Sequence, residues 1–186
     1  MSAMAAEDLY QTASLIDQLK HDDINVRVNS SSQLIRIASA LGPERTRNEL
    51  IPFLEETTDD DDEVLVVTAA KLGELVNYVG GREHVNCLLG PLELLAMIDE
   101  QSVRNATLLA VESVANAMSD ADLEKHYMPF VLKMATKEWY TARLTATGLF
   151  HFAYKRLDEG SHRSFRSTFL RLCMDDSPVV RRHTMM

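Results

Sequence analysis

The sequence predicts an all-α fold, a right-handed superhelical solenoid of HEAT repeats with about four complete repeats and part of a fifth. The first observation is an apolar pattern at positions i, i+3, i+4 and i+7, which marks one face of an α-helix. This pattern recurs with starts 38, 39 and 39 residues apart. Its members are Leu34, Ile37, Ala38 and Leu41; Leu72, Leu75, Val76 and Val79; Val111, Val114, Ala115 and Met118; and Phe150, Ala153, Tyr154 and Leu157.

The second observation is that another helical segment precedes each of these sets. These first segments cover residues 9–19, 50–57, 88–98 and 123–134. Two helices in about 40 residues is the HEAT or armadillo arrangement, whereas tetratricopeptide and ankyrin repeats have about 34 and about 33 residues. Pro52, Pro91 and Pro129 recur 39 and 38 residues apart within the first segments and are expected to bend them.

Turn residues divide residues 1–186 into the repeats of a single array. We expect repeats at 8–42, 43–81, 82–119, 120–160 and, incompletely, 161–186. Gly42-Pro43 and Gly80-Gly81 end the first two, because glycine commonly follows a helix end and proline opens the next helix. In the fifth repeat we expect Ser177 to cap a second helix of only about two turns. The array is therefore expected to be truncated at its C-terminal side and to be the start of a longer solenoid.

Composition favours a protein partner. The chain has 19 basic and 28 acidic residues and a formal net charge of −9, whereas nucleic-acid binding needs clustered Lys and Arg. No apolar run approaches the roughly 20 residues that span a bilayer, and no secretory signal precedes the first helix. We expect a cytoplasmic protein, with a nuclear location also open. Cys87 and Cys173 are isolated in sequence and should be buried, reduced thiols.

Catalytic and metal-binding motifs are missing from the sequence. The six histidines are scattered, and no HExxH motif, Cys/His metal spacing, GxSxG motif or phosphate-binding glycine loop occurs. The sequence therefore predicts no catalytic residue, no metal and no cofactor, and a protein that is not an enzyme.

A recurring arginine marks the start of the second helices. The position seven residues before each apolar set holds Arg27, Leu65, Arg104 and Arg143, and Arg181 follows 38 residues later. We expect these arginines to contact the acidic turn of their own or of the neighbouring repeat. The alternative is direct contact with a partner.

The turns inside the repeats should line one edge of the array, since a solenoid stacks equivalent turns. In this register they comprise residues 21–24, 59–63, 99–101, 137–140 and 175–178. Acidic residues dominate, with seven carboxylates within the nine residues 55–63. Such a run either caps and solvates the helix that follows or steers a basic partner, and the sequence favours neither interpretation.

Trp139 and Tyr140 form an aromatic pair in one of these otherwise polar turns. Both residue types are frequent anchors of protein interfaces, so we expect contact with a partner, with core packing as the alternative. Phe130, Phe165 and Phe169 follow helical spacing on first helices and are assigned to the core.

Several segments combine turn residues with the apolar pattern. They are LIDQL (15–19), LGPERTRNELIPFL (41–54), DDEVL (61–65), CLLGPLELLA (87–96), DLEKHYMPF (122–130), WYTARLTATGLF (139–150), FRSTFLRLC (165–173) and DDSPVVRR (175–182). In these segments the chain resembles the start of the family of scaffold, or A, regulatory subunits of protein phosphatase 2A. The resemblance covers residues 8–184 in order. It implies a horseshoe of HEAT repeats in which regulatory B-type subunits dock on N-terminal turns and the catalytic subunit docks on C-terminal repeats missing from this chain.

The resemblance also implies which residues line the regulatory-subunit side. Together with the neighbouring Asp62, these are Glu63, Asp99, Glu100, Trp139, Tyr140, Asp176, Pro178, Arg181 and Arg182. The chain departs from the family at two points. Gln101 and Ser102 follow the third-turn acids where a hydrophobic residue is typical, and Tyr140 stands where Phe is common.

We therefore interpret the chain as a non-enzymatic scaffold that holds a regulatory subunit beside a phosphatase catalytic subunit. An alternative from another class is a HEAT or armadillo transport adaptor that binds basic segments through its acidic edge. A helical hydrolase is a third class, which would require activity of the purified chain itself.

Overall fold

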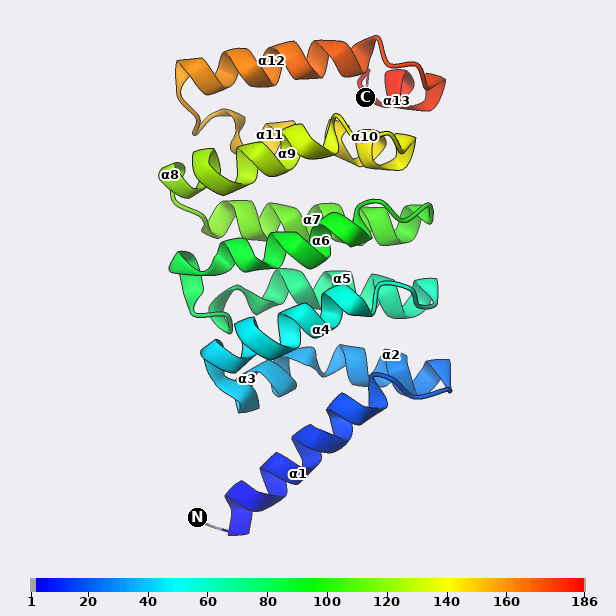
Figure 1. Cartoon of the computed structure of the whole chain (residues 1–186), viewed down its shortest axis with the longest axis vertical. Coiled ribbons are helices and arrows are strands. Elements are labelled where there is room, and N and C mark those ends of the chain that lie inside the picture. Colours follow the sequence, from blue (N-terminus) through cyan, green and yellow to red (C-terminus); the bar gives the residue numbers. More distant parts are fainter. Residues whose placement is uncertain (1–2, 186) are drawn as a thin grey trace.

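The computed structural model describes residues 3–185, with side chains from Gln11 onward, as two layers of helices stacked along one axis (Figure 1). The first layer contains α1 (Ala3–Gln18), α4 (Ile51–Glu56), α6 (Leu89–Leu95), α9 (Met128–Met134) and α12 (Glu159–Cys173). The second contains α2 (Ile24–Ser32), α3 (Leu34–Arg45), α5 (Asp62–Glu74), α7 (Gln101–Ala117), α10 (Tyr140–Thr147), α11 (Phe150–Tyr154) and α13 (Pro178–His183). Residues 3–185 contain no strand. The predicted all-α HEAT solenoid is confirmed.

Short helical segments complete the two layers. The first layer also contains the π-helical turns Thr46–Leu50 and Leu123–Tyr127, the 3₁₀ turns Gly81–Glu83 and Val85–Leu88, and α8 (Asp120–Asp122). In the second layer, the 3₁₀ turn Leu75–Asn77 continues α5. The first helix begins at Ala3, ahead of residue 8, the expected start of the first repeat.

The recurring apolar sets form the core between the layers. In the second and third repeats the side chains of Leu72, Leu75, Val111 and Val114 have no exposed surface. In each set at least three of the four members are buried, which confirms the helical register predicted from the sequence. Because each set lies between helices of its own and the adjoining repeat, burial is continuous along the stack.

Two of the expected second helices are broken. The first is interrupted at Gln33, where a serine run offers side-chain hydroxyls to the backbone: the hydroxyl of Ser32 donates to the carbonyl of Asn29 at 2.6 Å. Such bonds compete with the helical ladder. The second break lies at Gly148 and Leu149, between α10 and α11. Sequence periodicity predicts continuous helices at both places because the apolar face continues through each break.

Two of the three prolines in the first helices follow π-helical turns, whereas Pro91 lies in α6 after the 3₁₀ turn Val85–Leu88. Pro52 and Pro129 occupy the first turns of α4 and α9, directly after the π turns Thr46–Leu50 and Leu123–Tyr127. A proline lacks the N–H that a regular helix would use, and a wider turn before it is one way to accommodate the loss. At Pro52 and Pro129 the predicted bend is thus a local widening of the helix.

The turns between repeats lie along the edge opposite the intra-repeat turns. Gly42 and Gly80 adopt positive φ of 77° and 99°, which confirms both predicted helix ends. Gly42 lies within the bounds of α3, where its non-helical backbone divides the helix by a kink. Arg47 donates to the carbonyl of Val79 at 2.7 Å, and Arg82 donates to that of Ala117 at 3.1 Å. Arginines at the start of first helices therefore cap the ends of second helices in the same repeat.

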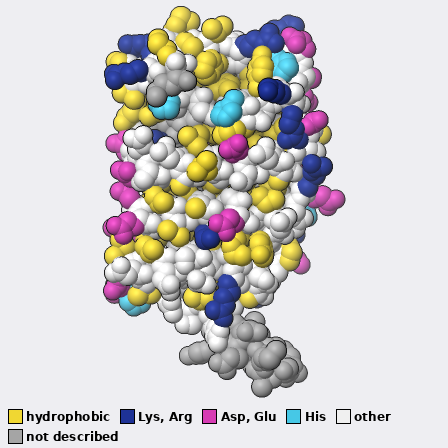
Figure 2. Space-filling model, turned by 180° about the vertical axis from the view of Figure 1, so that it is seen from behind, with side chains coloured by type: hydrophobic (Ala, Val, Ile, Leu, Met, Phe, Trp, Pro, Cys, Tyr) yellow, Lys and Arg dark blue, Asp and Glu magenta, His cyan; other side chains and the backbone are white. Residues whose placement is uncertain are grey.

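The second-layer face carries few charges in its centre, and acidic side chains appear at several levels of the edge formed by the intra-repeat turns (Figure 2). Near α12 and α13 this view shows hydrophobic, basic and histidine side chains together. Leu170, Met174, Val179 and Met185 are exposed there. A cavity of about 360 Å³ opens between α10–α11 and α12, lined mainly by Phe150, Tyr154, Phe165 and Phe169.

The other side-chain predictions have mixed outcomes. Phe130 and Phe165 are buried as predicted, and Phe169 is half-buried against the core. Cys87 and Cys173 are free, but both are only partly buried, so the predicted full burial is wrong. Burial nevertheless raises the pKa of the Cys87 thiol to about 11, which keeps it protonated at neutral pH.

Candidate functional site

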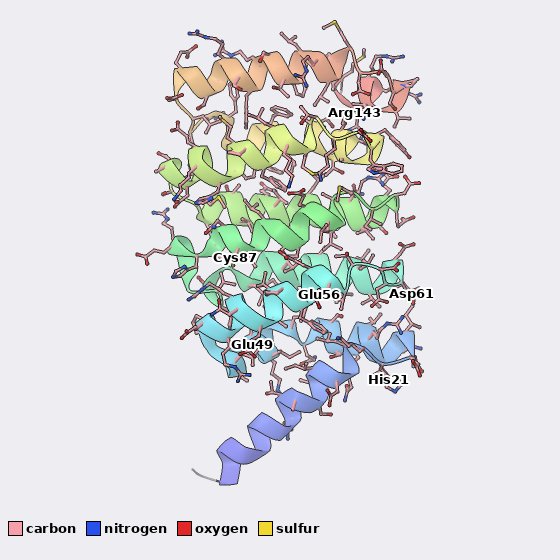
Figure 3. The ribbon with its side chains drawn as sticks, viewed as in Figure 1. His21, Glu49, Glu56, Asp61, Cys87 and Arg143 are labelled. Atoms are coloured by element: carbon pink, nitrogen blue, oxygen red, sulfur yellow. The ribbon has the colours of Figure 1, made fainter. Side chains whose placement is uncertain are left out.

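The intra-repeat turns lie along a single edge of the molecule, here called the turn ridge: residues 21–24, 59–63, 99–101, 137–140 and 175–178. Figure 3 shows His21, Asp61 and Arg143 on this edge, while Glu49 and Cys87 lie toward the other. Each turn joins a first-layer helix to the second-layer helix of the same repeat. The helix stack therefore brings residues about 40 positions apart in sequence next to one another.

The recurring arginines bind the backbone of the turns. Each directs Nη1 at the carbonyl oxygens five and six residues before it. Arg27 binds those of His21 and Asp22, Arg104 those of Ile98 and Asp99, Arg143 those of Lys137 and Glu138, and Arg181 those of Asp175 and Asp176. Carbonyls at the end of a helix lack intrahelical donors, and a cation there is favourable.

Two of these arginines also reach the next repeat. Arg27 Nε lies 2.9 Å from Asp60 Oδ1, and its Nη2 binds Asp61. Arg143 Nε lies 2.6 Å from Asp175 Oδ2. The hydrogen bond from Arg143 lowers the pKa of Asp175 below its ordinary value, and the same bond raises the pKa of Arg143. The predicted contacts with acidic turns are confirmed.

The second repeat has Leu65 at the arginine position, and this side chain is buried. An arginine at this position would contact the third turn, which contains Asp99. Asp99 is bound instead by a residue of the fourth turn. The hydroxyl of Tyr140 donates to Asp99 Oδ1 at 2.7 Å. This hydrogen bond raises the pKa of Tyr140. The hydroxyl that distinguishes Tyr140 from the common Phe therefore links the third turn to the fourth.

The five acids of the second turn, residues 59–63, divide into two groups. Asp60 and Asp61 are paired with Arg27. Asp59, Asp62 and Glu63 are exposed, and the structure gives their carboxylates no hydrogen-bond or ion-pair partner. Asp62 and Glu63 begin α5, where a negative charge also complements the helix dipole. Both interpretations of this run therefore have residues that fit them.

Glu100 and the fifth turn contain further local bonds. Glu100 accepts from the backbone N–H of Ser102 at 3.1 Å and so caps α7. This backbone bond is the main reason that the pKa of Glu100 is lowered.

In the fifth turn, Ser177 lies at the predicted cap position, yet its side chain makes no capping bond. Asp175 Oδ1 accepts from the Ser177 N–H at 2.9 Å instead. Pro178 opens α13.

Trp139 and Tyr140 lie on the surface of the fourth turn. Trp139 is 73% exposed and Tyr140 is 40% exposed, so neither belongs to the core. Trp139 precedes α10 with extended backbone angles, φ −68° and ψ 125°. A large aromatic side chain with this exposure has area available for contact with another protein.

The predicted site residues are spread over four turns. The hydroxyl of Tyr140 binds Asp99 directly, while Asp62 and Glu63 lie on the second turn and share no hydrogen bond or ion pair with the other predicted residues. In the fifth turn, Asp176, Pro178 and Arg182 are exposed, and Arg181 is half-buried and engaged with its own turn. The ridge is thus an extended surface rather than a pocket.

The residues that join the third and fourth repeats lie outside the predicted site. Glu93 binds Lys133 Nζ and Lys137 Nζ at 2.8 and 2.9 Å, and the hydroxyl of Thr141 donates to the carbonyl of Met97 at 2.8 Å. Glu93 and Lys133 are separated by 40 residues, one repeat length. Repeat spacing between opposite charges is the signal that could have identified this pair.

No group of His, Cys, Asp and Glu side chains within the described residues forms a potential metal site. Every helix of residues 3–185 is too short or too polar to cross a membrane.

Comparison with known proteins gives a consistent group of relatives. No family model matches the chain. The A-type regulatory subunit of protein phosphatase PP2A from Schizosaccharomyces pombe is 47% identical over 176 residues, which are 94% of this chain and 30% of the relative. The alpha isoform of the 65 kDa A-type regulatory subunit of serine/threonine-protein phosphatase 2A from Arabidopsis thaliana is 46% identical over 180 residues, 97% of this chain and 31% of the relative.

The protein phosphatase 2A scaffold subunit of Dictyostelium discoideum is 42% identical over 178 residues, which are 95% of the chain and 30% of the relative. The chain therefore spans about 30% of the length of the curated relatives that it matches.

Proposed function

Because the chain belongs to the family of A-type regulatory, or scaffold, subunits of protein phosphatase 2A, we propose that it acts as a non-enzymatic scaffold of this serine/threonine phosphatase. In this proposal its turn ridge binds a regulatory B-type subunit. The catalytic subunit binds through repeats that correspond to the unmatched part of the relatives. A cytoplasmic or nuclear location is part of the same proposal.

The observation that carries the proposal is the exposure of Trp139, 73%, on a turn whose backbone is fixed by internal hydrogen bonds. Tryptophan is among the residues most enriched at the energetic centres of protein interfaces. The proposed contact residues surround it along the ridge: Asp62, Glu63, Asp99, Glu100, Tyr140, Asp176, Pro178, Arg181 and Arg182. Arg181 would contribute through Nε and Nη2, since its Nη1 binds within the turn.

The mechanism is geometric. A solenoid with rigid turns fixes the separation and orientation of two partners bound along it, and so raises the effective concentration of one near the other. In this proposal the catalytic subunit carries out catalysis, and the scaffold holds the regulatory subunit beside it.

Binding of purified regulatory B-type subunits to the 186-residue chain, measured by calorimetry, tests the proposal. We expect a one-to-one complex with at least one class, and no complex when the catalytic subunit is the only partner present. Glu63→Lys changes a proposed contact residue. Glu44→Lys makes the same change of charge on the edge opposite the ridge and is the matched control. If no class of regulatory subunit binds the chain, under conditions in which the same subunits bind a full-length relative, the docking role is wrong.

A transport adaptor for basic segments is the second candidate, and the free carboxylates of Asp59, Asp62 and Glu63 favour it. A lysine- and arginine-rich peptide should then bind the chain with an affinity that falls in Glu63→Lys. The scaffold proposal expects such a peptide to bind weakly and not to displace a regulatory subunit.

A further inference from the structure

The fourth turn, residues 137–140, is bound through side chains to both the third and the fifth repeat. Towards the third repeat it is held by Lys137 and Tyr140, and towards the fifth by Arg143. No other turn among the described residues has side-chain bonds to the turn on each side. The side chain of Trp139, at the centre of this arrangement, makes no hydrogen bond.

Glu93 is the least exposed member of the ion pairs on the third-repeat side. Its side chain on α6 is 16% exposed and accepts from Lys137 Nζ at 2.9 Å and from Lys133 Nζ. Partial burial alone would raise the pKa of Glu93, but the hydrogen bonds from the two lysines outweigh it and lower the pKa. Glu93 is therefore ionised at neutral pH and holds the side chain of the residue at which the turn begins.

The backbone of the same turn is fixed by Arg143. Its Nη1 binds the carbonyl of Lys137 at 2.9 Å and also that of Glu138. The remaining nitrogens, Nε and Nη2, bind Asp175 at 2.6 and 3.0 Å. The peptide groups immediately before Trp139 thus share a guanidinium that is itself held by the fifth turn.

Tyr140 and Thr141 fix the other end of the turn. The Tyr140 hydroxyl donates to Asp99 Oδ1, and the Thr141 hydroxyl donates to the carbonyl of Met97. Trp139 therefore lies between two points at which the chain is bound to the third repeat. A turn backbone held in this way is fixed before a partner arrives, which reduces the entropy lost on binding.

We propose that Glu93 and the hydroxyl of Tyr140 are positioning residues that hold Trp139 in its binding orientation, Glu93 through Lys137 and Tyr140 through Asp99. This inference rests on the proposed function only for the identity of the partner. The ordering of Trp139 is a property of the free chain and can be measured without any partner.

Trp139 is the single tryptophan of the chain, so its fluorescence reports on this turn alone. Time-resolved anisotropy with selective excitation would be compared for the wild type, Glu93→Gln and Tyr140→Phe. Glu93→Gln removes the negative charge that pairs with the two lysines, and Tyr140→Phe removes the hydroxyl that binds Asp99, while both keep the size of the side chain. We expect the amplitude of fast local motion of the indole to increase in both variants. Glu44→Gln removes a carboxylate that has no partner on the opposite edge, and should leave the anisotropy decay unchanged.

Regulatory-subunit binding provides the second readout. Glu93→Gln and Tyr140→Phe should weaken binding by about 2- to 10-fold, the range expected when one side chain must be ordered on association. Lys137→Met tests whether Glu93 positions Trp139 through Lys137. If Glu93 acts through Lys137, adding Glu93→Gln to Lys137→Met should change neither the anisotropy nor the affinity further.

Two outcomes would overturn the inference. Unchanged indole motion in both Glu93→Gln and Tyr140→Phe would mean that these bonds do not order Trp139. A further increase in motion when Glu93→Gln is added to Lys137→Met would refute the route through Lys137. Increased motion in a chain that binds no regulatory subunit would instead support the positioning role and count against the proposed function. Circular dichroism of every variant separates these results from loss of helix, and Tyr140→Phe tests positioning even if Glu93→Gln unfolds.

Discussion

Tyr127 donates its phenol hydrogen to the carbonyl oxygen of Leu149, 2.8 Å away, at the break between α10 and α11. The Tyr127 side chain is fully buried. Desolvation raises its pKa well above the ordinary value, so the hydroxyl stays protonated and serves as a donor. The break therefore does not leave this carbonyl without a partner inside the protein.

Tyr127→Phe should lower the free energy of unfolding by about 1–2 kcal/mol, because a buried carbonyl loses its donor. Chemical denaturation measures the change. Tyr78→Phe is the matched control, since the half-buried Tyr78 makes no hydrogen bond with its hydroxyl. An equal loss of stability in both variants would contradict a specific role for the bond to Leu149.

Gly73→Ala should destabilise the array by about 1–3 kcal/mol, the usual range for overpacking a tight interface. A Cβ at residue 73 would lie 2.8 Å from the Cα of Ala110, so α5 and α7 would have to separate. Gly160→Ala is the control, because its Cβ would meet only the Asp158 side chain, at 3.3 Å. Thermal unfolding should show a lower Tm for Gly73→Ala and an unchanged or higher Tm for Gly160→Ala.

The Arg143–Asp175 pair should make stability depend on pH in the acidic range. Folding lowers the pKa of Asp175, so the pair contributes fully above the unfolded pKa of about 3.9 and loses its contribution as pH falls towards the lower folded value. Asp175→Asn should flatten the fall in Tm between neutral and acidic pH. Asp176→Asn, which removes an unbonded carboxylate from the same turn, should keep the wild-type profile.

Trp139→Ala should weaken regulatory-subunit binding by about 2 kcal/mol or more and leave Tm nearly unchanged, because the ring is exposed and lies outside the core. Leu109→Ala provides the comparison. Leu109 is 67% exposed on α7, away from the ridge, and its truncation should affect neither quantity. Parallel losses of Tm and affinity in Trp139→Ala would show that the ring stabilises the turn instead.

The free carboxylates of Asp62 and Glu63 should accelerate association with a basic partner surface. The association rate should fall as salt rises, because the Debye length shrinks from about 10 Å at 0.1 M to about 3 Å at 1 M. Stopped-flow measurements of the wild type, Glu63→Lys and Glu44→Lys would separate ridge charge from net charge. A rate that responds neither to salt nor to Glu63→Lys rules out steering.

The features predicted most successfully from the sequence are those that recur once per repeat. The arginine position was found by spacing alone, and Arg27, Arg104, Arg143 and Arg181 all bind the carbonyls of their own turns. Because the backbone geometry of the turns repeats, one physical interpretation suffices for every copy. The same reasoning located the apolar core.

Features specific to one repeat could not be predicted in this way. The breaks at Gln33 and Gly148 depend on local hydroxyls and on Tyr127, which approaches from the other layer. The pairing of Glu93 with Lys137 depends on side-chain reach between repeats, and so does the bond from Tyr140 to Asp99. Apolar periodicity is insensitive to such polar contacts.

Leu65, at the position that holds arginine in the other repeats, has a mechanical consequence. Among the described residues no side-chain bond joins the second turn to the third, so this junction depends on close packing of α5 against α7. The junctions at Arg27 and Arg143 contain ion pairs, which ionic strength weakens to the extent that solvent reaches them. The array should therefore have uneven elasticity: added salt softens those two joints, while the joint at Leu65 keeps its stiffness.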